Sequence, residues 1–239
     1  MKTNVAQKLI ELNRRFYQSF AESFSETRGR LQPGVMRLLD GIPANACVLD
    51  LGCGNGELAR ELGRRDHKGE YLGLDFSAGM LEEARQEAAD FAQLRLADLT
   101  SGNWDEGLSG EQYDYVLAFA TLHHIPGREL RMQILEKARG LVAPGGRFLH
   151  SNWQPLNSER LKARLQPWET IGLSEADVEA GDLLLDWRRD GQGLRYVHQF
   201  EEEELVELAG DAGFRVKEVF RSDGEGGRLG LYGVWEPVR

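Results

Sequence analysis

A glycine-rich turn between an apolar strand and a helix constrains this chain more than any other feature. Residues 48–51 are apolar apart from Asp50, and Gly52, Gly54 and Gly56 follow before a helix begins near Gly56. Because glycine has no Cβ and tolerates positive φ, a ligand can lie against the backbone of such a turn. The first N–H groups of the helix lack partners, so they can bind an anionic part of that ligand. The stretch predicts a ligand site at the end of a strand.

The spacing of the glycines restricts the kind of ligand. A phosphate-binding P-loop requires Lys followed by Ser or Thr after its last glycine, whereas Glu57 and Leu58 stand there. The dinucleotide fingerprint is G-x-G-x-x-G, whereas this chain has G-x-G-x-G, with an acid two residues before the first glycine. The spacing therefore argues against a P-loop and against a dinucleotide site. The alternative to any ligand site is a tight turn that binds no ligand.

Three further apolar stretches follow, each predicted as a strand. Residues 70–75 end at Asp75, about 20 residues beyond the glycine turn, where a carboxylate can accept the ribose hydroxyls of a nucleoside. Ser77 then suits a helix N-cap. Residues 92–97 lead to Asp98, and residues 113–119 form the next strand.

Strands alternate with helices from residue 45 to 151, which predicts a parallel sheet covered on both faces. In such sheets ligands bind beyond the carboxyl ends of the strands. Four predicted strand ends therefore converge on one crevice, and they carry Asp50, Asp75, Asp98 and Phe119.

This order of motifs resembles that of the class I S-adenosylmethionine-dependent methyltransferases over residues 45–150. A Pro-Gly-Gly turn at 144–146 and a fifth strand complete the set. The resemblance implies a Rossmann-like, seven-stranded sheet that is mostly parallel, with an antiparallel last strand and helices on both faces. It implies S-adenosyl-L-methionine as the cofactor and an Asp98 that reads the adenine amino group. The implied cofactor contacts in this core are Asp50, Gly52, Cys53, Gly54, Gly56, Asp75, Phe76, Ser77, Met80, Asp98, Leu99, Phe119 and Ala120.

We expect one domain over residues 1–239, with residues 1–44 as an N-terminal helical cover. Apolar residues recur at a spacing near four between Val5 and Phe20, which predicts an amphipathic helix with Arg14 and Arg15 on its other side, and a second helix is expected at 33–39. Two residues of this part are further cofactor candidates. Tyr17 could cover the sulfonium through a cation–π contact, or simply pack on a helix face. Arg28 could meet the methionine carboxylate, or pair with a surface acid.

The alternation stops at residues 152–196, which hold three of the five tryptophans. The family commonly inserts substrate-covering helices at this position; the alternative is a packing elaboration without substrate contact. A helix is expected at 201–212, and strands at 215–221 and 229–236 resemble the closing hairpin of the family.

Two flanking segments carry a second resemblance. Residues 24–28 and 195–200 look like parts of the eukaryotic tRNA wobble-uridine carboxymethyl methyltransferases, which esterify the carboxylate of 5-carboxymethyluridine. Val197 separates Tyr196 from His198, where that family has a Tyr-His pair. We therefore predict a small-molecule, nucleoside-type or carboxylate acceptor, with tRNA as the alternative acceptor. A non-catalytic S-adenosylmethionine-binding subunit is the alternative from another functional class.

Three histidines are candidates for a catalytic base. His123 and His124 follow the fourth strand, and His198 lies in the second resemblance. A carboxylate acceptor is ionised at neutral pH and needs no base, whereas a phenol, amine or ring nitrogen could need one. Each histidine could instead be a packing residue.

Composition limits the partners and the compartment. The net charge of −10 argues against a broad, non-specific grip on nucleic acid. No apolar run of 18 residues exists and no secretory signal is evident, so we expect neither a membrane span nor export. Cys47 and Cys53 flank the first strand, which suggests buried thiols in a reducing cytoplasm rather than a disulfide or a metal site.

Overall fold

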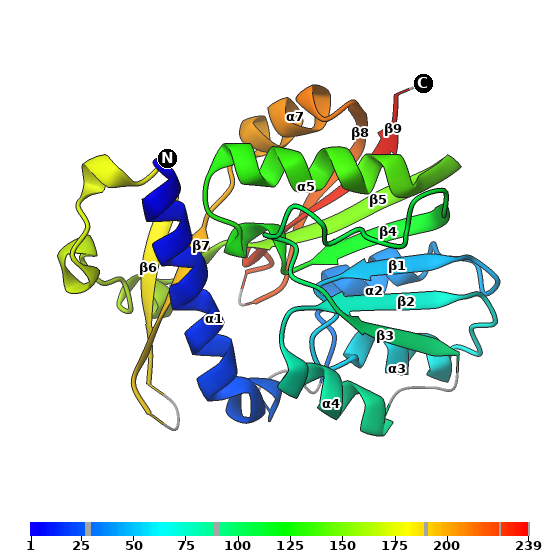
Figure 1. Ribbon diagram of the computed structural model, residues 1–239, viewed down its shortest axis with the longest axis horizontal. Coiled ribbons are helices and arrows are strands. Elements are labelled where there is room, and N and C mark those ends of the chain that lie inside the picture. Colours follow the sequence, from blue (N-terminus) through cyan, green and yellow to red (C-terminus); the bar gives the residue numbers. More distant parts are fainter. Residues whose placement is uncertain (27–29, 88–90, 189–190, 225, 239) are drawn as a thin grey trace.

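A seven-stranded sheet forms the centre of the computed structural model, which describes residues 1–26, 30–87, 91–188, 191–224 and 226–238 (Figure 1). The strand order is β3-β2-β1-β4-β5-β9-β8. β9 is antiparallel to both neighbours, whereas β1 to β5 pair in parallel, which confirms the predicted sheet. The strands are β1 (Val48–Leu51), β2 (Tyr71–Asp75), β3 (Ala92–Leu96), β4 (Tyr113–Phe119), β5 (Val142–Trp153), β8 (Phe214–Ser222) and β9 (Gly230–Pro237).

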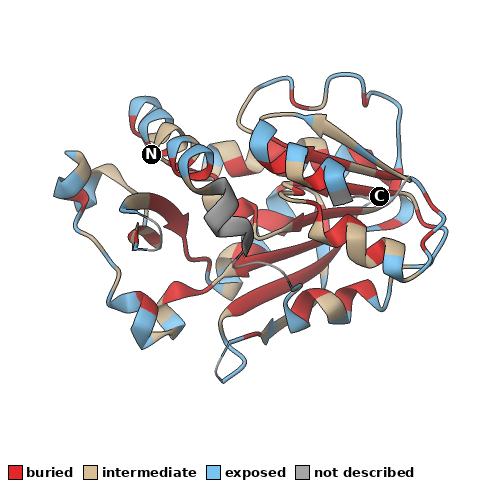
Figure 2. Ribbon diagram, turned by 90° about the horizontal axis from the view of Figure 1, so that it is seen from below, coloured by how far each residue is buried: buried red, intermediate tan, exposed pale blue. Residues whose placement is uncertain are grey.

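Helices cover both faces of this sheet, as Figures 1 and 2 show. Successive residues of a strand point to opposite faces, so Leu49 joins the core beneath α5 and α7, whereas Val48 joins the core beneath α2 and α3. Because both faces are covered, all four residues of β1 are buried. The helices of this layer are α2 (Pro33–Leu39), α3 (Glu57–Arg64), α4 (Ala78–Glu87), α5 (Arg128–Leu141) and α7 (Glu202–Asp211).

The predicted Pro-Gly-Gly turn is part of β5 instead of preceding it. Tyr113 pairs with Val142 and Tyr115 with Arg147, so the register shifts across residues 143–146. The extra residues bulge out of the ladder, and Gly145 has a φ of +86° there. The strand therefore starts directly at the end of α5.

A second, smaller layer stands beside the carboxyl ends of the strands. It consists of α1 (Thr3–Glu26) and the segment between β5 and α7, and it lies to the left of the sheet in Figure 1. The family resemblance implied covering helices here, but the segment also forms an antiparallel two-stranded sheet. Its elements are η2 (Pro155–Asn157), α6 (Glu159–Lys162), η3 (Trp168–Ile171), η4 (Glu175–Asp177), β6 (Asp182–Trp187) and β7 (Gly193–His198).

The helix α1 packs against this small sheet and reaches back to the core. Near its start, Leu9 packs with Leu184 and Tyr196. Further along, Phe16 joins a cluster with Met80 of α4 and with Trp187. The predicted amphipathic pattern is thus satisfied by the inserted segment and by α4 rather than by the large sheet.

Candidate functional site

A cavity of about 650 Å³ opens at the carboxyl ends of the strands. It lies where the strand order reverses, because β2 and β3 continue from β1 in one direction and β4 and β5 in the other. Ligands of open α/β sheets bind at such a switch point. Residues of α1, of the turn after β1 and of the inserted segment line its walls. Its volume is in the range of roughly 300–1,000 Å³ that is typical of small-molecule sites.

The glycines of the turn after β1 serve different purposes. All three have positive φ, +85° at Gly52, +55° at Gly54 and +77° at Gly56. A Cβ at Gly52 would lie 2.4 Å from Oγ1 of Thr121, and one at Gly56 would lie 2.9 Å from the Cβ of Ala84. A Cβ at Gly54 would meet no atom within 4 Å. Gly52 and Gly56 therefore allow close packing, whereas Gly54 leaves its backbone open toward the cavity.

Two buried carboxylates differ in their environments at this end of the sheet. Asp50 accepts a hydrogen bond from the hydroxyl of Tyr71 at 2.7 Å, and burial raises its pKa to about 7. Asp75 accepts the N–H groups of Gly54 at 2.9 Å and Ser77 at 2.8 Å. Burial raises the pKa of Asp75 too, although these backbone hydrogen bonds oppose the shift. Both side chains line the cavity.

Asp98 links the sheet to α1. One of its oxygens accepts the N–H of Thr100 at 2.9 Å, and the other pairs with the guanidinium of Arg14. The sequence predicts Arg14 on the side of the helix opposite its apolar residues, but it does not predict that this side meets Asp98. Arg14 lies three residues before Tyr17, so the two share a helix face and both line the cavity. This spacing was the signal that could have revealed Arg14.

Most of the remaining cofactor candidates of the core also line the cavity. Phe119 ends β4, and Ala120 after it has a φ of +53°, a sparsely populated conformation that concentrates at functional sites. The ring of Phe76 lies 6.0 Å from that of Tyr17, centroid to centroid. Arg28 falls outside the described residues, and Gly56 is not among the described lining residues. The lining includes Cys53, Phe76, Ser77, Met80, Leu99, Phe119 and Ala120.

His124 is the histidine that the structure brings into the cavity. Its Nδ1 lies 3.3 Å from the carbonyl oxygen of Tyr196, and its Nε2 lies 2.7 Å from the hydroxyl of Tyr17. A carbonyl oxygen only accepts hydrogen bonds, so in the neutral imidazole Nδ1 carries the proton and Nε2 accepts from Tyr17. His124 therefore presents a basic nitrogen toward the cavity, capped by a tyrosine of α1.

The other two predicted catalytic histidines lie elsewhere. His123 is buried, its Nδ1 accepts the N–H of Trp153 at 3.3 Å, and it is absent from the described cavity lining. His198 is also absent from that lining, because residues alternate along β7: Arg195 faces the cavity, and the side chain of His198 lies on the opposite face. The geometry therefore does not support the prediction that these two act on the acceptor.

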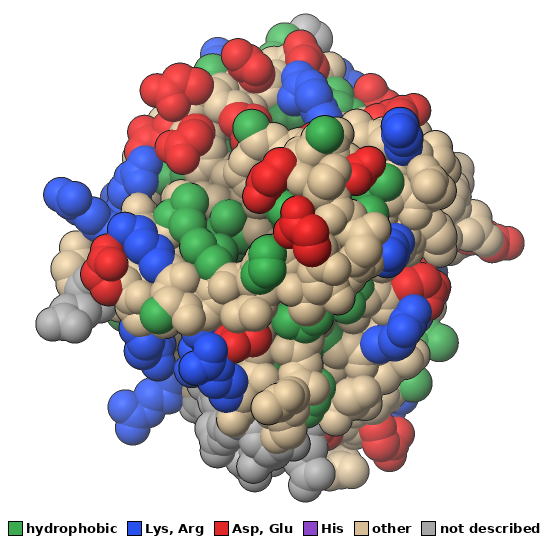
Figure 3. Space-filling view, turned by 90° about the vertical axis from the view of Figure 1, so that its left-hand side faces the viewer, with side chains coloured by type: hydrophobic (Ala, Val, Ile, Leu, Met, Phe, Trp, Pro, Cys, Tyr) green, Lys and Arg blue, Asp and Glu red, His purple; other side chains and the backbone are tan. Residues whose placement is uncertain are grey.

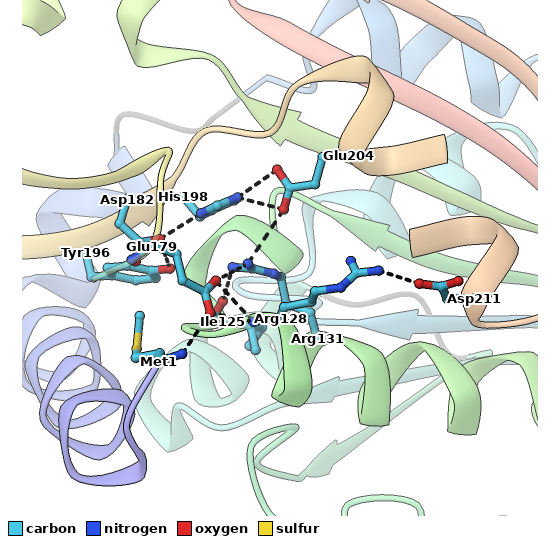
Figure 4. Close-up of polar contacts among 10 residues, drawn as sticks. All are labelled: Met1, Ile125, Arg128, Arg131, Glu179, Asp182, Tyr196, His198, Glu204 and Asp211. Carbon is cyan, nitrogen blue, oxygen red and sulfur yellow. Dashed lines mark hydrogen bonds and ion pairs between the residues drawn. The ribbon is translucent and has the colours of Figure 1, made fainter. Parts of the chain in front are cut away.

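His198 instead belongs to a buried polar network, shown in Figure 4. Its Nδ1 lies 2.7 Å from Asp182, and its Nε2 lies 3.0 Å from Glu204 of α7. Burial opposes the charged imidazolium, but the hydrogen bonds to these two acids outweigh it and raise the pKa of His198. Arg131 of α5 extends the network to Glu204 at 3.6 Å and to Glu179 at 2.7 Å.

Arg195 brings positive charge into an aromatic environment. Its guanidinium carbon lies 4.6 Å from the ring centroid of Trp153, 5.4 Å from that of Phe16 and 5.7 Å from that of Trp187. The residue is buried, and it lines the cavity on the side of the inserted segment. Aromatic faces stabilise the cation without neutralising its charge, so Arg195 adds positive charge to this side of the cavity.

Comparison with known proteins shows that the chain is similar to methyltransferases. Residues 49–148 match the family model described as "Methyltransferase domain". A protein of Encephalitozoon cuniculi that is named as a methyltransferase is 29% identical over 209 residues, 84% of this chain and 86% of its own length. The tRNA (carboxymethyluridine(34)-5-O)-methyltransferase of Saccharomyces cerevisiae is 30% identical over 152 residues, 62% of this chain and 50% of that enzyme.

Solved structures agree on the fold. The protein DhpI, in a complex with SAM and HEP, superimposes with a TM-score of 0.69 at 24% identity and covers 96% of this chain and 98% of its own. At this identity the likeness concerns the arrangement of the strands and helices. It extends over almost the whole chain, including α1 and the segment inserted after β5.

Proposed function

Because the chain is an S-adenosylmethionine-dependent methyltransferase, we propose that it methylates a small acceptor, either of nucleoside type or with a carboxylate. The observation that carries this proposal is the position of Arg195. Its cationic guanidinium lines the same cavity as the glycine turn, on the side of the inserted segment. A carboxylate held there would be ionised at neutral pH and would need no base.

The cavity residues suit the cofactor, which when bound supplies a methyl group on a cationic sulfur. We infer that Asp75 accepts the ribose hydroxyls and that Asp98 accepts the adenine amino group. Each carboxylate has lone pairs beyond those used by its present partners. The open backbone at Gly54 leaves space for close approach. Tyr17 would lie over the sulfonium, where its ring attracts a cation.

An acceptor with a hydroxyl or a ring nitrogen would require a base, and we assign that role to His124. Its Nε2 already accepts a hydrogen bond, from Tyr17. To accept a proton from the acceptor, it must exchange this partner for the acceptor or receive the proton through the tyrosine hydroxyl. α1 thus supplies both the cap of the base and part of the cavity wall.

We assign α1 and residues 152–196 the role of a cover that excludes water from the transferred methyl group and fixes the acceptor. The other predicted part of this cover, α2, packs on the large sheet instead. The aromatic and arginine side chains of the cover support this role, since Tyr17, Trp153, Trp187 and Arg195 all line the cavity.

A tRNA acceptor is the second candidate, and the relative from Saccharomyces cerevisiae favours it. The chain spans only half the length of that enzyme. The net charge of −10 opposes tight binding of an anionic polymer by this chain alone. No helix in the described part of the chain is long and apolar enough to cross a membrane. We place the reaction in the cytoplasm, in keeping with the free thiols of Cys47, which is half-buried, and Cys53, which is buried.

The test is transfer of a tritiated methyl group from S-adenosylmethionine to three pools: free nucleosides, small carboxylic acids and intact tRNA. We expect labelling in one of the first two pools, and its loss in Asp75→Ala. Efficient labelling of tRNA by the isolated chain would make tRNA the acceptor. Binding of the cofactor with no labelling of any pool would favour a non-catalytic subunit.

A further inference from the structure

The far end of the cavity carries arginines that the transfer of a methyl group does not require. Arg160 and Arg164 line the cavity from α6 and the residues after it, and Arg30 lines it from the segment before α2. Building on the proposed function, we propose that Arg160 and Arg164 bind a second anionic group of the acceptor. This group, a phosphate or a carboxylate, is distinct from the group that receives the methyl.

The position of these arginines separates them from the cofactor acids. Asp75 ends β2, whereas Leu229 and Gly230, which also line the cavity, lie at the start of β9. β2 and β9 are four strands apart in the sheet, or roughly 19 Å at the usual strand spacing. The segment that leads to α6 is tied to the β9 end, because the N–H of Gln154 donates to the carbonyl oxygen of Leu229 at 2.9 Å. The cavity therefore extends past the cofactor end toward α6.

Positive charge exceeds negative charge at the end of the cavity near α6. Within the described residues, neither Arg160 nor Arg164 forms an ion pair with an acid, although Lys162 between them pairs with Glu159 at 2.7 Å. The acid among the described lining residues near β9 is Asp223, which is buried.

Among the described residues, Asp223 forms no ion pair with either arginine, and its oxygens accept hydrogen bonds from other groups. One accepts the N–H of Gly34 at 3.0 Å, and the other accepts the hydroxyl of Tyr232. A chain with 39 acids and 29 basic residues thus leaves positive charge at the wall of its cavity. Guanidinium groups suit phosphate and carboxylate because their N–H groups match the geometry of two oxygens.

The observations favour a small anion over an RNA strand. Proteins that track a phosphate backbone present a basic stripe on their surface. Figure 3 shows the side of the molecule that carries α1 and the inserted segment, and its basic side chains stand in separate groups among acidic ones. Arg160, which is exposed, and Arg164, which is half-buried, instead lie at the wall of the cavity.

The experiment is a calorimetric titration of the protein loaded with S-adenosylhomocysteine. Inorganic phosphate and uridine 5′-monophosphate are the probes, and uridine is the uncharged reference. The double variant Arg160→Ala/Arg164→Ala should bind both anions about ten- to a hundredfold more weakly than the wild type, since hydrogen bonds to charged groups are lost. Lys162→Ala is the matched control, because Lys162 lies between the two arginines and is paired with Glu159; it should bind like the wild type.

Two outcomes would overturn the proposal. Equal affinity of the wild type and the double variant for both anions would show that the arginines bind no anion. A short RNA stem–loop that binds more tightly than uridine 5′-monophosphate, and weakens in the same double variant, would assign the arginines to RNA instead. Failure of the proposed function can be distinguished from failure of this proposal. In that case the wild type would not bind S-adenosylhomocysteine when it is loaded before the titration.

Discussion

Individual residues at the strand ends have similar chemistry but different surroundings. Asp75 is supported by two backbone N–H groups, whereas Asp50 receives one side-chain hydrogen bond, from Tyr71. A buried carboxylate with few donors holds its proton more tightly. Asp50 therefore titrates near neutral pH, and Asp75 is better prepared to act as an anionic acceptor of hydrogen bonds.

The raised pKa of Asp50 makes stability depend on pH. Its pKa is about 7 in the folded protein and 3.8 in the unfolded reference, so the folded state binds the proton more tightly. This contribution is fully present below about pH 4 and is lost as the pH rises through 7. Asp50→Asn keeps an acceptor for Tyr71 but does not titrate, so it should raise the free energy of unfolding at pH 8 by on the order of 4 kcal/mol.

Denaturant unfolding of the cofactor-free protein at several pH values checks this prediction. At pH 4 the variant and the wild type should have nearly the same free energy of unfolding, because Asp50 is then protonated. A constant difference between pH 4 and pH 8 would contradict the assigned pKa.

Asp75→Ala should weaken S-adenosylhomocysteine binding by about ten- to a hundredfold, because a charged acceptor of hydrogen bonds is lost. The same change removes the acceptor for the N–H groups of Gly54 and Ser77, so some loss of stability is also expected. Calorimetry measures the affinity, and circular dichroism confirms that the variant is folded. A folded variant with unchanged affinity would reject Asp75 as the ribose ligand.

Among the elements, those specified by local pattern were predictable and those specified by distant contacts were not. The bounds of β4 and α2 match the prediction, because local sequence defines them: β4 is a short, mostly apolar run, and α2 begins at Pro33 and ends shortly before Gly41. β6 and β7 were missed, since a short apolar run such as residues 183–185 fits a strand or a buried helix equally well. The pairing of Arg14 with Asp98 depends on how α1 docks, which its own sequence does not encode.

The turn between β1 and α3 allows two glycine roles to be separated. Gly56→Ala places a Cβ against Ala84 at positive φ and should cost about 1–3 kcal/mol of stability. Gly54→Val should mainly reduce cofactor affinity, because its side chain would enter open space where the ligand is expected. Thermal unfolding and calorimetry on both variants separate the effects. If the Gly54→Val protein bound S-adenosylhomocysteine normally, the cofactor could not lie against this turn.

The elements of the cover should differ in mobility from the central strands. α1 and residues 152–195 border the cavity, whereas β1 and β4 are buried in the sheet. We expect faster amide hydrogen exchange in the cover, and slower exchange there after S-adenosylhomocysteine binds. Mass spectrometry of exchanged peptides measures this. Exchange that is equally slow in the cover and the strands, with no ligand effect, would argue against a mobile cover.

At the scale of the whole molecule, the network in Figure 4 joins the inserted segment to the core. Asp182 and His198 belong to the small sheet, whereas Arg131 and Glu204 belong to α5 and α7. One end of the inserted segment is therefore anchored by charged, buried hydrogen bonds, and the other lines the cavity. The protonation state of His198 should control how firmly this anchor holds.

Protonation of His198 should therefore make the stability of the protein depend on pH. The pKa of His198 is raised in the folded protein, so its contribution to stability is fully present below about pH 6.5 and is lost as the pH rises through the raised value. His198→Gln keeps hydrogen-bonding capacity but carries no charge. The variant should be less stable than the wild type at pH 6 by about 1–2 kcal/mol, with a smaller difference at pH 9. His150→Gln is the control, because burial lowers the pKa of His150 to about 3 and leaves it neutral throughout this range. A stability difference for His198→Gln that stays constant from pH 6 to pH 9 would show that a neutral histidine suffices to anchor the inserted segment.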